Sequence, residues 1–251
     1  MALTLQNHGA IFHAMRATEA LTATQNRLAS LGWYAGKIDG REGHLTDLAL
    51  TDFKRASGLR ARPKIGPITL TRLFARGATR KPVPLPNLSA QPWMHEAKRL
   101  LGTKEYAGDA NNPIIMDWAD NLDIHYTGDD VPWCGLLVAH CLNFGAPDDP
   151  QDFNRLAARE WRKYARSVDP QLGALLVIWR GSRDGWQGHV GFYVGEDAEA
   201  YHVLGGNQGN SVSVVRIAKD RLLDARYPKS FAPTGKIVLV DDRSSLSTNE
   251  Q

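Results

Sequence analysis

Cysteine is scarce in this chain, and its scarcity excludes several kinds of small protein. Only Cys134 and Cys141 occur among the 251 residues. Two cysteines cannot form the dense disulfide framework of a small secreted scaffold. They also cannot supply the ligands of a cysteine-rich zinc module, so neither class of protein is expected.

Long apolar runs are also missing. No segment approaches the roughly 18 to 20 consecutive apolar residues that span a bilayer. Residues 1–15 have neither a basic beginning nor an unbroken apolar stretch, so they do not predict a secretory signal. With 43% hydrophobic and 23% charged residues, the composition is that of an ordinary globular protein. We expect a chain that is made in the cytoplasm and has no membrane span.

The net charge of +3 conceals an uneven distribution of charged residues. Residues 1–90 contain 13 Lys or Arg and 5 Asp or Glu, whereas residues 91–251 contain 17 and 22. This asymmetry predicts two units with different partners, the first of which meets something anionic. Charge alone is equally compatible with two solvated surfaces.

Four prolines mark a break in the sequence at residues 81–92. Because proline donates no backbone hydrogen bond and favours extended chain, this stretch predicts a semi-rigid linker. The break predicts a small three-helix module over residues 1–80 and a second unit over residues 93–240. A flexible tail is expected over residues 241–251. The expected fold class is α+β, with helices packed on an antiparallel sheet in the second unit.

The first unit has the pattern of three short helices around a glycine-rich loop. Apolar residues at helical spacing predict helices over residues 17–32, 46–57 and 67–76. Gly32 is expected to end the first helix and Thr46 to cap the second. Pro67 is expected in the first turn of the third, where its missing N–H has no cost.

The glycines, an Asp-Gly pair and the flanking leucines of this unit occur in a characteristic order. The residues are Gln25, Leu28, Leu31–Gly32–Trp33–Tyr34, Gly36, Ile38–Asp39–Gly40, Gly43, Thr46, Phe53, Gly58–Leu59 and Gly66–Pro67–Ile68–Thr69. In these residues the segment 17–76 resembles the peptidoglycan-binding domain family of cell-wall modules. The resemblance implies that Trp33, Tyr34 and Asp39 contact peptidoglycan. Arg62–Pro63–Lys64 departs from the family's usual Asp-Gly turn. A module that serves only folding, or that binds another partner, stays open.

The second unit contains a strongly apolar segment at residues 131–145, which predicts a helix that begins near Pro132. Cys134 falls in its first turn, where the partial positive charge of the helix N-terminus favours the nucleophilic thiolate. Cys141 lies two turns further along and is interpreted as a small core residue. Two helical turns rise about 10 Å, which is too far for a disulfide between the two cysteines.

Further patterns predict a hairpin that carries a histidine. Helices are predicted over residues 93–101 and 112–120, and strands over residues 173–179, 189–195 and 200–208. If Gly195 pairs with Ala200, then His189 faces Gly206 and lies next to Asn207. An amide beside an imidazole is the arrangement that orients a catalytic histidine.

The residues around the cysteine and the histidine follow a recognisable order. They are Glu105, Asn112–Pro113, Pro132–Trp133–Cys134, Gly188–His189–Val190–Gly191–Phe192–Tyr193 and Leu204–Gly205–Gly206–Asn207–Gln208. In these residues the segment 93–227 resembles the papain-like amidohydrolases of the CHAP and NlpC type. Within that type it most resembles a subgroup that is common in phage lysis proteins. The resemblance implies a cysteine-bearing helix on an antiparallel sheet. It also implies hydrolysis of an amide bond in the peptide part of peptidoglycan.

The resemblance assigns a role to each of three residues. Cys134 is the nucleophile, His189 is the general base and then acid, and Asn207 orients the imidazole. The third position varies among such enzymes, and Glu196 competes with Asn207 for it. Candidates for substrate binding in this unit are Glu105, Trp133, Trp186 and Gln208.

The other histidines and an acidic loop do not predict a metal site. His125, His140 and His202 lack ligand spacing to a partner. Residues 117–130 hold five aspartates but lack the glycine and the terminal glutamate of a calcium loop. No metal and no cofactor are expected.

The sequence thus predicts a monomeric peptidoglycan hydrolase, either an endopeptidase or an N-acetylmuramoyl-L-alanine amidase. As an endolysin it would act in the periplasm or cell wall after holin-type or other dedicated export, with its basic first unit on the anionic cell envelope. An antibacterial effector with the same chemistry, which would need an immunity protein, and a non-catalytic wall-binding protein stay open. The arginines of the first unit come without a groove-reading motif, so no nucleic-acid partner is expected.

Overall fold

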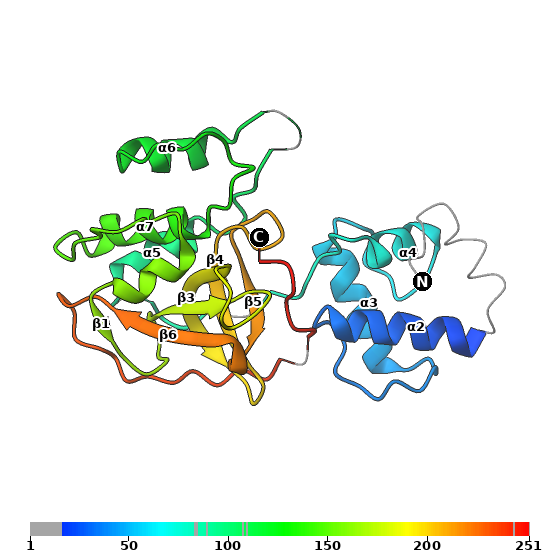
Figure 1. Cartoon of the computed structure of the whole chain (residues 1–251). Coiled ribbons are helices and arrows are strands. Elements are labelled where there is room, and N and C mark those ends of the chain that lie inside the picture. The colour runs from blue at the N-terminus through cyan, green and yellow to red at the C-terminus, as the bar shows by residue number, and fades with distance from the viewer. Residues whose placement is uncertain are drawn as a thin grey trace. The chain divides into compact units, whose positions relative to one another are not determined.

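The computed structural model describes residues 17–82, 85–88, 90–106, 108, 110–242 and 244–250. Over these residues the chain has a helical N-terminal region and then a six-stranded antiparallel sheet with helices, which confirms the expected α+β class (Figure 1). None of the helices in this part of the chain is long and apolar enough to cross a membrane.

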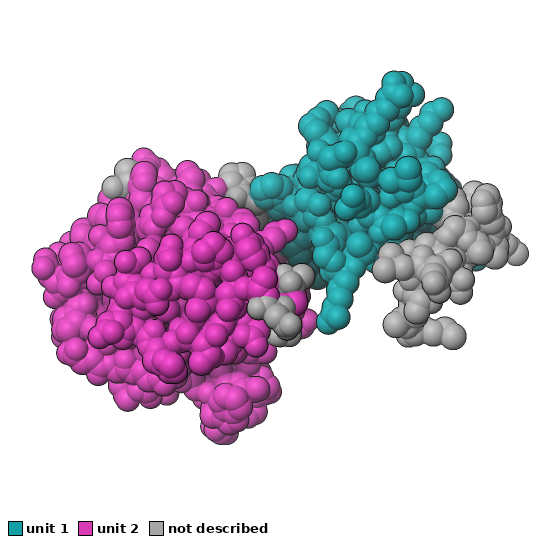
Figure 2. Space-filling model, turned by 90° about the horizontal axis from the view of Figure 1, so that it is seen from above, with its two compact units in different colours: residues 1–83, 242–245 teal, residues 84–241, 246–251 magenta. Residues whose placement is uncertain are grey.

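The chain divides into two compact units, which Figure 2 shows in different colours. Unit 1 comprises residues 1–83 and 242–245, and unit 2 comprises residues 84–241 and 246–251. The boundary between residues 83 and 84 falls inside the stretch predicted as a linker. Leu88, near the end of that stretch, is buried in the core of unit 2 rather than extended in solvent.

Unit 1 is built from the helices α2 (Ala17–Ser30), α3 (His44–Ala56) and α4 (Pro67–Phe74). Their core includes Leu28, Leu50, Phe53 and Leu73. Pro67 occupies the first turn of α4, as predicted.

The predicted cap of α3 is wrong. Gly43 precedes the helix as its N-cap residue, and Thr46 lies inside the helix and is buried. The Thr46 hydroxyl instead accepts a hydrogen bond from Gln25 Nε2 at 3.1 Å. A tertiary contact therefore uses the hydroxyl that local sequence pattern assigns to the helix end.

The buried amide of Gln25 holds the glycine-rich loop that joins α2 to α3. Its Oε1 accepts hydrogen bonds from the backbone N–H groups of Asp39 and Gly40, at 3.1 and 2.9 Å. Its Nε2 also donates to the Arg41 carbonyl at 3.0 Å. Gly40 has a φ of +68°, and a Cβ there would lie 2.5 Å from Thr22 Oγ1, so both the backbone and the space require glycine.

Unit 2 contains the sheet, whose strand order is β1-β6-β2-β3-β4-β5 with every pair antiparallel. The strands are β1 (Arg166–Ser167), β2 (Leu175–Trp179), β3 (Gly188–Glu196), β4 (Ala200–Gly205), β5 (Ser213–Ala218) and β6 (Leu222–Tyr227). The sequence predicted β2, β3 and β4, with bounds that differ by up to three residues. A short 3₁₀ helix, η3 (Lys219–Arg221), joins β5 to β6.

Helices of unit 2 pack against one face of the sheet. They are α5 (Pro92–Arg99), α7 (Cys134–Gly145) and the 3₁₀ helix η2 (Ala158–Lys163), whereas α6 (Pro113–Asn121) packs on α7. Apolar side chains of α5 and α7 share a core with Leu175 and Val177 of β2, whereas Leu176 and Ile178 belong to a separate apolar cluster. This alternation arises because successive strand residues point to opposite faces. In Figure 1, α5 and α7 lie together beside the sheet.

The last described residues of the chain, 246–250, pack on unit 2. Residues 246–250 belong to unit 2, and the Glu250 side chain is only 1% exposed. The expected flexible tail therefore does not describe these residues, because backbone hydrogen bonds and a buried ion pair fix them. Gln251 lies outside the described residues.

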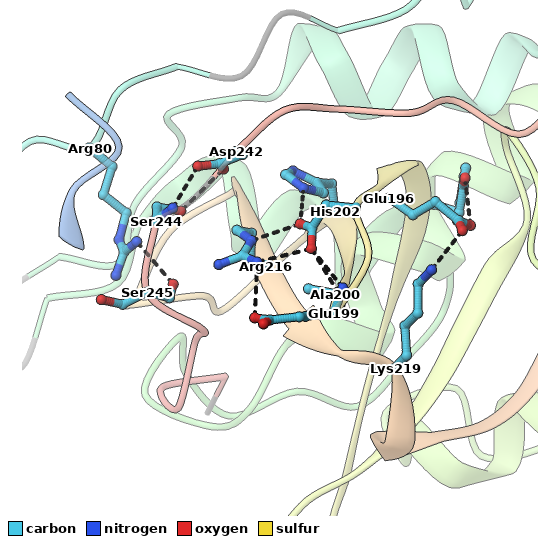
Figure 3. A network of polar contacts seen from close by, with 12 residues as sticks. Arg80, Glu196, Glu199, Ala200, His202, Arg216, Lys219, Asp242, Ser244 and Ser245 are labelled. Carbon is cyan, nitrogen blue, oxygen red and sulfur yellow. Dashed lines mark hydrogen bonds and ion pairs between the residues drawn. The ribbon is translucent and has the colours of Figure 1, made fainter. Parts of the chain in front are cut away.

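A carboxylate at the turn between β3 and β4 gathers several donors. Asp197 accepts hydrogen bonds from Arg216 Nε and Nη2, at 2.8 and 3.0 Å, and His202 Nε2 lies 2.9 Å from its Oδ2. Figure 3 shows Arg216 and His202 at this carboxylate, together with the separate 2.7 Å ion pair of Lys219 and Glu196. Burial raises the pKa of Asp197, but the hydrogen bonds and the Arg216 charge outweigh it and hold the pKa well below its usual range.

We expect Gln25→Ala to make unit 1 easier to unfold. The substitution leaves the N–H groups of Asp39 and Gly40 without their acceptor, which should lower the free energy of unfolding by about 2 to 3 kcal/mol. Urea titration followed by circular dichroism measures the loss. The matched control is Asn26→Ala, because the exposed Asn26 amide donates to the Thr22 carbonyl of its own helix. An equal loss in both variants would contradict the role given to Gln25.

We expect Asp197→Asn to lower the free energy of unfolding by about 2 kcal/mol at neutral pH, because Arg216 and His202 lose a charged partner. The folded-state pKa of Asp197 lies below the unfolded value. Its contribution is therefore present above the unfolded pKa of about 4 and is lost as the pH falls through the folded pKa. Thermal unfolding at a series of acidic pH values should show the two proteins converging. A constant difference across that series, or an equal effect of the exposed Asp184→Asn, would refute this origin of stability.

Candidate active site

Cys134 is the first residue of α7, as predicted, and is 3% exposed. The helix begins directly after Trp133, whose indole N–H donates to Glu105 Oε1 at 2.7 Å. A Cβ on Gly135 would lie 2.2 Å from the Arg155 carbonyl oxygen, so only glycine lets the helix start approach that segment. Close packing on both sides thus fixes where the sulfur lies.

The sulfur of Cys134 is surrounded by groups with opposing effects on its ionisation. Burial, the largest effect, raises the pKa of Cys134 above its usual value. Backbone N–H groups of Val190, Gly135 and Cys134 itself favour the thiolate, as does the charge of Arg180. The predicted effect of the helix start is present, but burial outweighs it, so the thiol is favoured in this conformation.

His189 lies near the start of β3, opposite Ile178 of β2, and is completely buried. Its Nε2 is 3.0 Å from Gln208 Oε1. The Gln208 amide nitrogen donates to the carbonyl oxygens of Ser213 and Val203, at 2.6 and 3.3 Å. Because that end of the amide faces acceptors, Oε1 must face the imidazole. Nε2 therefore carries the proton, and Nδ1 holds the lone pair that can act as a base.

The imidazole of His189 is neutral at neutral pH. Burial lowers its pKa to about 4, while the Glu250 charge and the Gln208 hydrogen bond oppose that shift and the charges of Arg180 and Arg221 add to it. Nδ1 is buried and has no hydrogen-bond partner among the residues that the structure describes. The bond between the thiol and the imidazole is thus not formed in this conformation.

The predicted register between β3 and β4 is wrong. Gly195 pairs with His202 rather than with Ala200, because the four-residue turn lies one residue later than expected, and a bulge between Tyr193 and Gly195 then reduces the offset to one residue. Continued to His189, the observed register would place Asn207 opposite the imidazole in place of Gly206, but β4 ends at Gly205, before that position.

Because the chain turns after Gly205, Gln208 and not Asn207 hydrogen-bonds to His189. Asn207 has a φ of +56°, and its buried Oδ1 accepts no hydrogen bond from the described part of the chain. Glu196, the other candidate, lies at the far end of β3, where it accepts hydrogen bonds from Tyr193 and Lys219.

Two glycines allow the end of β4 to pass close to the imidazole. A Cβ on Gly205 would lie 2.8 Å from Gln208 Oε1 and 3.1 Å from His189 Nε2. A Cβ on Gly206 would lie 2.6 Å from a ring carbon of Trp133. The Gly-Gly pair beside Asn-Gln was the sequence signal of this close approach, although the pattern did not distinguish the two amides.

The substrate-binding candidates of unit 2 fall into different environments. Trp133 is 0% exposed and Glu105 is half-buried against it, so Trp133 is a core residue and not a binding surface. Burial also raises the pKa of Glu105. Gln208 is buried and positions His189. Trp186, in the loop between β2 and β3, is 85% exposed and is available to a ligand.

The candidates of unit 1 also differ in exposure. Trp33 donates to the Thr79 carbonyl at 2.8 Å and packs on the core, and the buried Tyr34 donates to the Lys37 carbonyl at 2.8 Å. Asp39 is exposed, and its carboxylate accepts a hydrogen bond from a backbone N–H. Four large apolar side chains of this unit are exposed, namely Ile38, Leu45, Leu48 and Ile68.

Two of the other histidines make structural contacts, whereas His125 is exposed. His140 lies 2.8 Å from Glu96 and stacks on the Trp118 ring, and His202 lies on Asp197. Within the described ranges, no group of three or more His, Cys, Asp or Glu side chains could hold a metal ion.

Unit 1 has a match among known families. Residues 18–73 match the family model described as a putative peptidoglycan binding domain. The match confirms the resemblance noted for this segment and supports association with the cell wall. No curated protein matches the chain, and no solved structure does so either. Support for the roles predicted for Cys134 and His189 therefore comes from the geometry of unit 2 alone.

We expect Gln208→Ala to change the tautomer of His189, because Nε2 loses the acceptor that keeps its proton there. Nitrogen chemical shifts of the imidazole distinguish the tautomers. Asn207→Gly is the comparison, since glycine accepts the positive φ and removes only the neighbouring amide. Gln187→Ala, in an exposed loop position, controls for loss of a glutamine. A changed tautomer in Asn207→Gly with an unchanged one in Gln208→Ala would restore the sequence-based assignment.

Proposed function

We propose that this protein hydrolyses an amide bond in the peptide part of peptidoglycan, with Cys134 as the nucleophile. One observation carries the proposal: Cys134 at the start of α7 and Val190 of β3, the neighbour of His189, lie in the same buried core. His189 is in turn bound by Gln208. A nucleophile, a base and an orienting group are thereby contributed by three separate segments.

The first half of the proposed reaction forms a thioester. His189 Nδ1 takes the thiol proton of Cys134, and the thiolate attacks the carbonyl carbon of the substrate amide. Backbone N–H groups at the start of α7 stabilise the resulting oxyanion. When the C–N bond breaks, the His189 imidazolium returns its proton to the leaving amine, and the acyl group stays on sulfur.

The second half of the reaction restores the thiol. His189 Nδ1 takes a proton from water, and the resulting hydroxide attacks the thioester carbon. The C–S bond then breaks, and the thiolate recovers the proton from His189 while a carboxylic acid leaves. Gln208 supports both halves, because its Oε1 holds the Nε2 proton and keeps Nδ1 directed to the chemistry.

Unit 1 supplies the argument for the substrate. Its match to a putative peptidoglycan binding domain supports cell-wall association, and a hydrolase held on the wall gains a high local concentration of peptide cross-links. We therefore place the activity in the periplasm or cell wall, where peptidoglycan lies. An endolysin fits this proposal. An effector delivered into competing bacteria, with an immunity protein in the producer, is the alternative setting for the same chemistry.

We expect Cys134→Ala to lower the release of soluble peptide fragments from purified peptidoglycan by about a thousandfold or more, since it removes the nucleophile. Mass spectrometry of the fragments would identify the bond that is cut. The matched control is Cys141→Ala, because Cys141 is buried in the core two turns along the same helix. Melting curves should confirm that both variants fold. Undiminished release by folded Cys134→Ala would overturn the proposed function.

A further inference from the structure

The segment 246–250 runs alongside the residues that hold the active site. Its Asn249 carbonyl accepts a hydrogen bond from the Gly209 N–H at 3.0 Å, and the Ser247 N–H donates to the Arg216 carbonyl at 2.7 Å. Glu250 and Gln208 form an isolated antiparallel bridge. The segment thus pairs, as an extended peptide does, with the chain that positions His189.

The side chain at the end of this segment is bound as a carboxylate ligand would be. Glu250 is 1% exposed, and its Oε2 and Oε1 lie 2.8 and 3.2 Å from Arg221 Nη2 and Nη1. Two parallel N–H···O bonds are the geometry with which arginine recognises carboxylates. Both groups are largely withdrawn from solvent. Because an isolated buried charge is costly, each group needs the opposite charge of the other.

Arg221 is also held in place by groups other than Glu250. Its Nε donates to the Trp179 carbonyl at 3.2 Å, and its guanidinium lies 5.8 Å from the centre of the Trp179 ring. Trp179 follows directly on Ile178, which pairs with His189 across β2 and β3. The Nη groups are therefore directed by the fold, and they remain available when the carboxylate leaves.

This ion pair lies within electrostatic reach of the catalytic imidazole. The Glu250 charge favours protonation of His189 and the Arg221 charge opposes it. The same interaction contributes to the lowering of the Glu250 pKa, in which burial is opposed by Arg221. A carboxylate-binding group beside the base of a peptide hydrolase lies where a charged group of the substrate can be recognised.

We propose that Arg221 is the subsite for a carboxylate of an acidic peptide substrate, and that residues 246–250 occupy it as an internal substrate mimic. The inference rests on the proposed hydrolase. Four features support it: extended backbone pairing, a two-bond carboxylate contact, an arginine fixed independently of that contact, and proximity to His189. The segment must leave before a substrate peptide pairs with the same chain, and in this conformation both Cys134 and His189 are buried.

The occupancy is tested by the reactivity of the Cys134 thiol toward iodoacetamide, followed by mass spectrometry of the native protein. We expect Glu250→Gln to speed alkylation of Cys134 by about tenfold, since it removes a charged hydrogen-bond pair that holds the segment. Cys141, fully buried elsewhere in α7, is the internal reference. Glu199→Gln is the matched control, because that side chain is 77% exposed.

The substrate role of Arg221 is tested by a second variant. Arg221→Gln should also speed alkylation, because it releases Glu250. It should lower hydrolysis of purified peptidoglycan, whereas Glu250→Gln should raise it. Amidation of the free carboxylates of the peptidoglycan should remove the difference between the two variants. The peptide Leu-Ser-Thr-Asn-Glu should slow alkylation of Glu250→Gln, and Leu-Ser-Thr-Asn-Gln should not.

Two kinds of failure are distinguishable. Equal alkylation of wild type and Glu250→Gln, or hydrolysis that changes in the same direction in both variants, would overturn the inference alone while wild-type activity upholds the hydrolase. No hydrolysis by any folded variant, with faster alkylation of Glu250→Gln, would overturn the proposed function and with it the substrate role of Arg221.

Discussion

The hydrogen bond between Gln208 and His189 is the contact on which the candidate active site depends. It is made possible by Gly205, because any side chain there would displace one of the two partners. The Ser213 and Val203 carbonyls accept hydrogen bonds from the Gln208 amide nitrogen and so orient the amide with its oxygen toward His189. One buried amide thereby decides which imidazole nitrogen carries the proton, and so which nitrogen can act on Cys134.

Each of the two units contains a buried glutamine amide that fixes a neighbouring segment or side chain by hydrogen bonds. In unit 1 the buried Gln25 amide satisfies backbone groups on both sides of the glycine-rich loop, and so holds the segment that matches a cell-wall module. In unit 2 the Gln208 amide accepts a hydrogen bond from the buried imidazole of His189. A neutral amide suits both places because it offers donors and an acceptor without the desolvation cost of a buried charge.

Burial decides the protonation states of the two central side chains of the candidate site. It raises the pKa of Cys134 and lowers that of His189, so both groups are neutral and no hydrogen bond links His189 Nδ1 to another described residue. Glu250 of the 246–250 segment and Arg221 of η3 both act on the imidazole, and their charges form an ion pair with each other. This ion pair is the basis of the proposal that the segment 246–250 occupies the place of a charged peptide.

Several features of the fold could be predicted from short-range sequence patterns alone. Pro67 at the first turn of α4, Cys134 at the first turn of α7 and the strand that carries His189 follow from residues a few positions apart, so pattern predicts them. The cap of α3, the register of β3 with β4 and the identity of the orienting amide were predicted incorrectly. A bulge shifts every later residue, and a hydroxyl or amide chooses partners that are distant in sequence. The sequence by itself determined the α+β class, the three helices that match a wall-binding domain and the positions of Cys134 and His189, which we propose as nucleophile and base. Only the tertiary structure decided that Gln208 orients His189 and that Glu250 lies on Arg221, because these contacts depend on how separate segments pack.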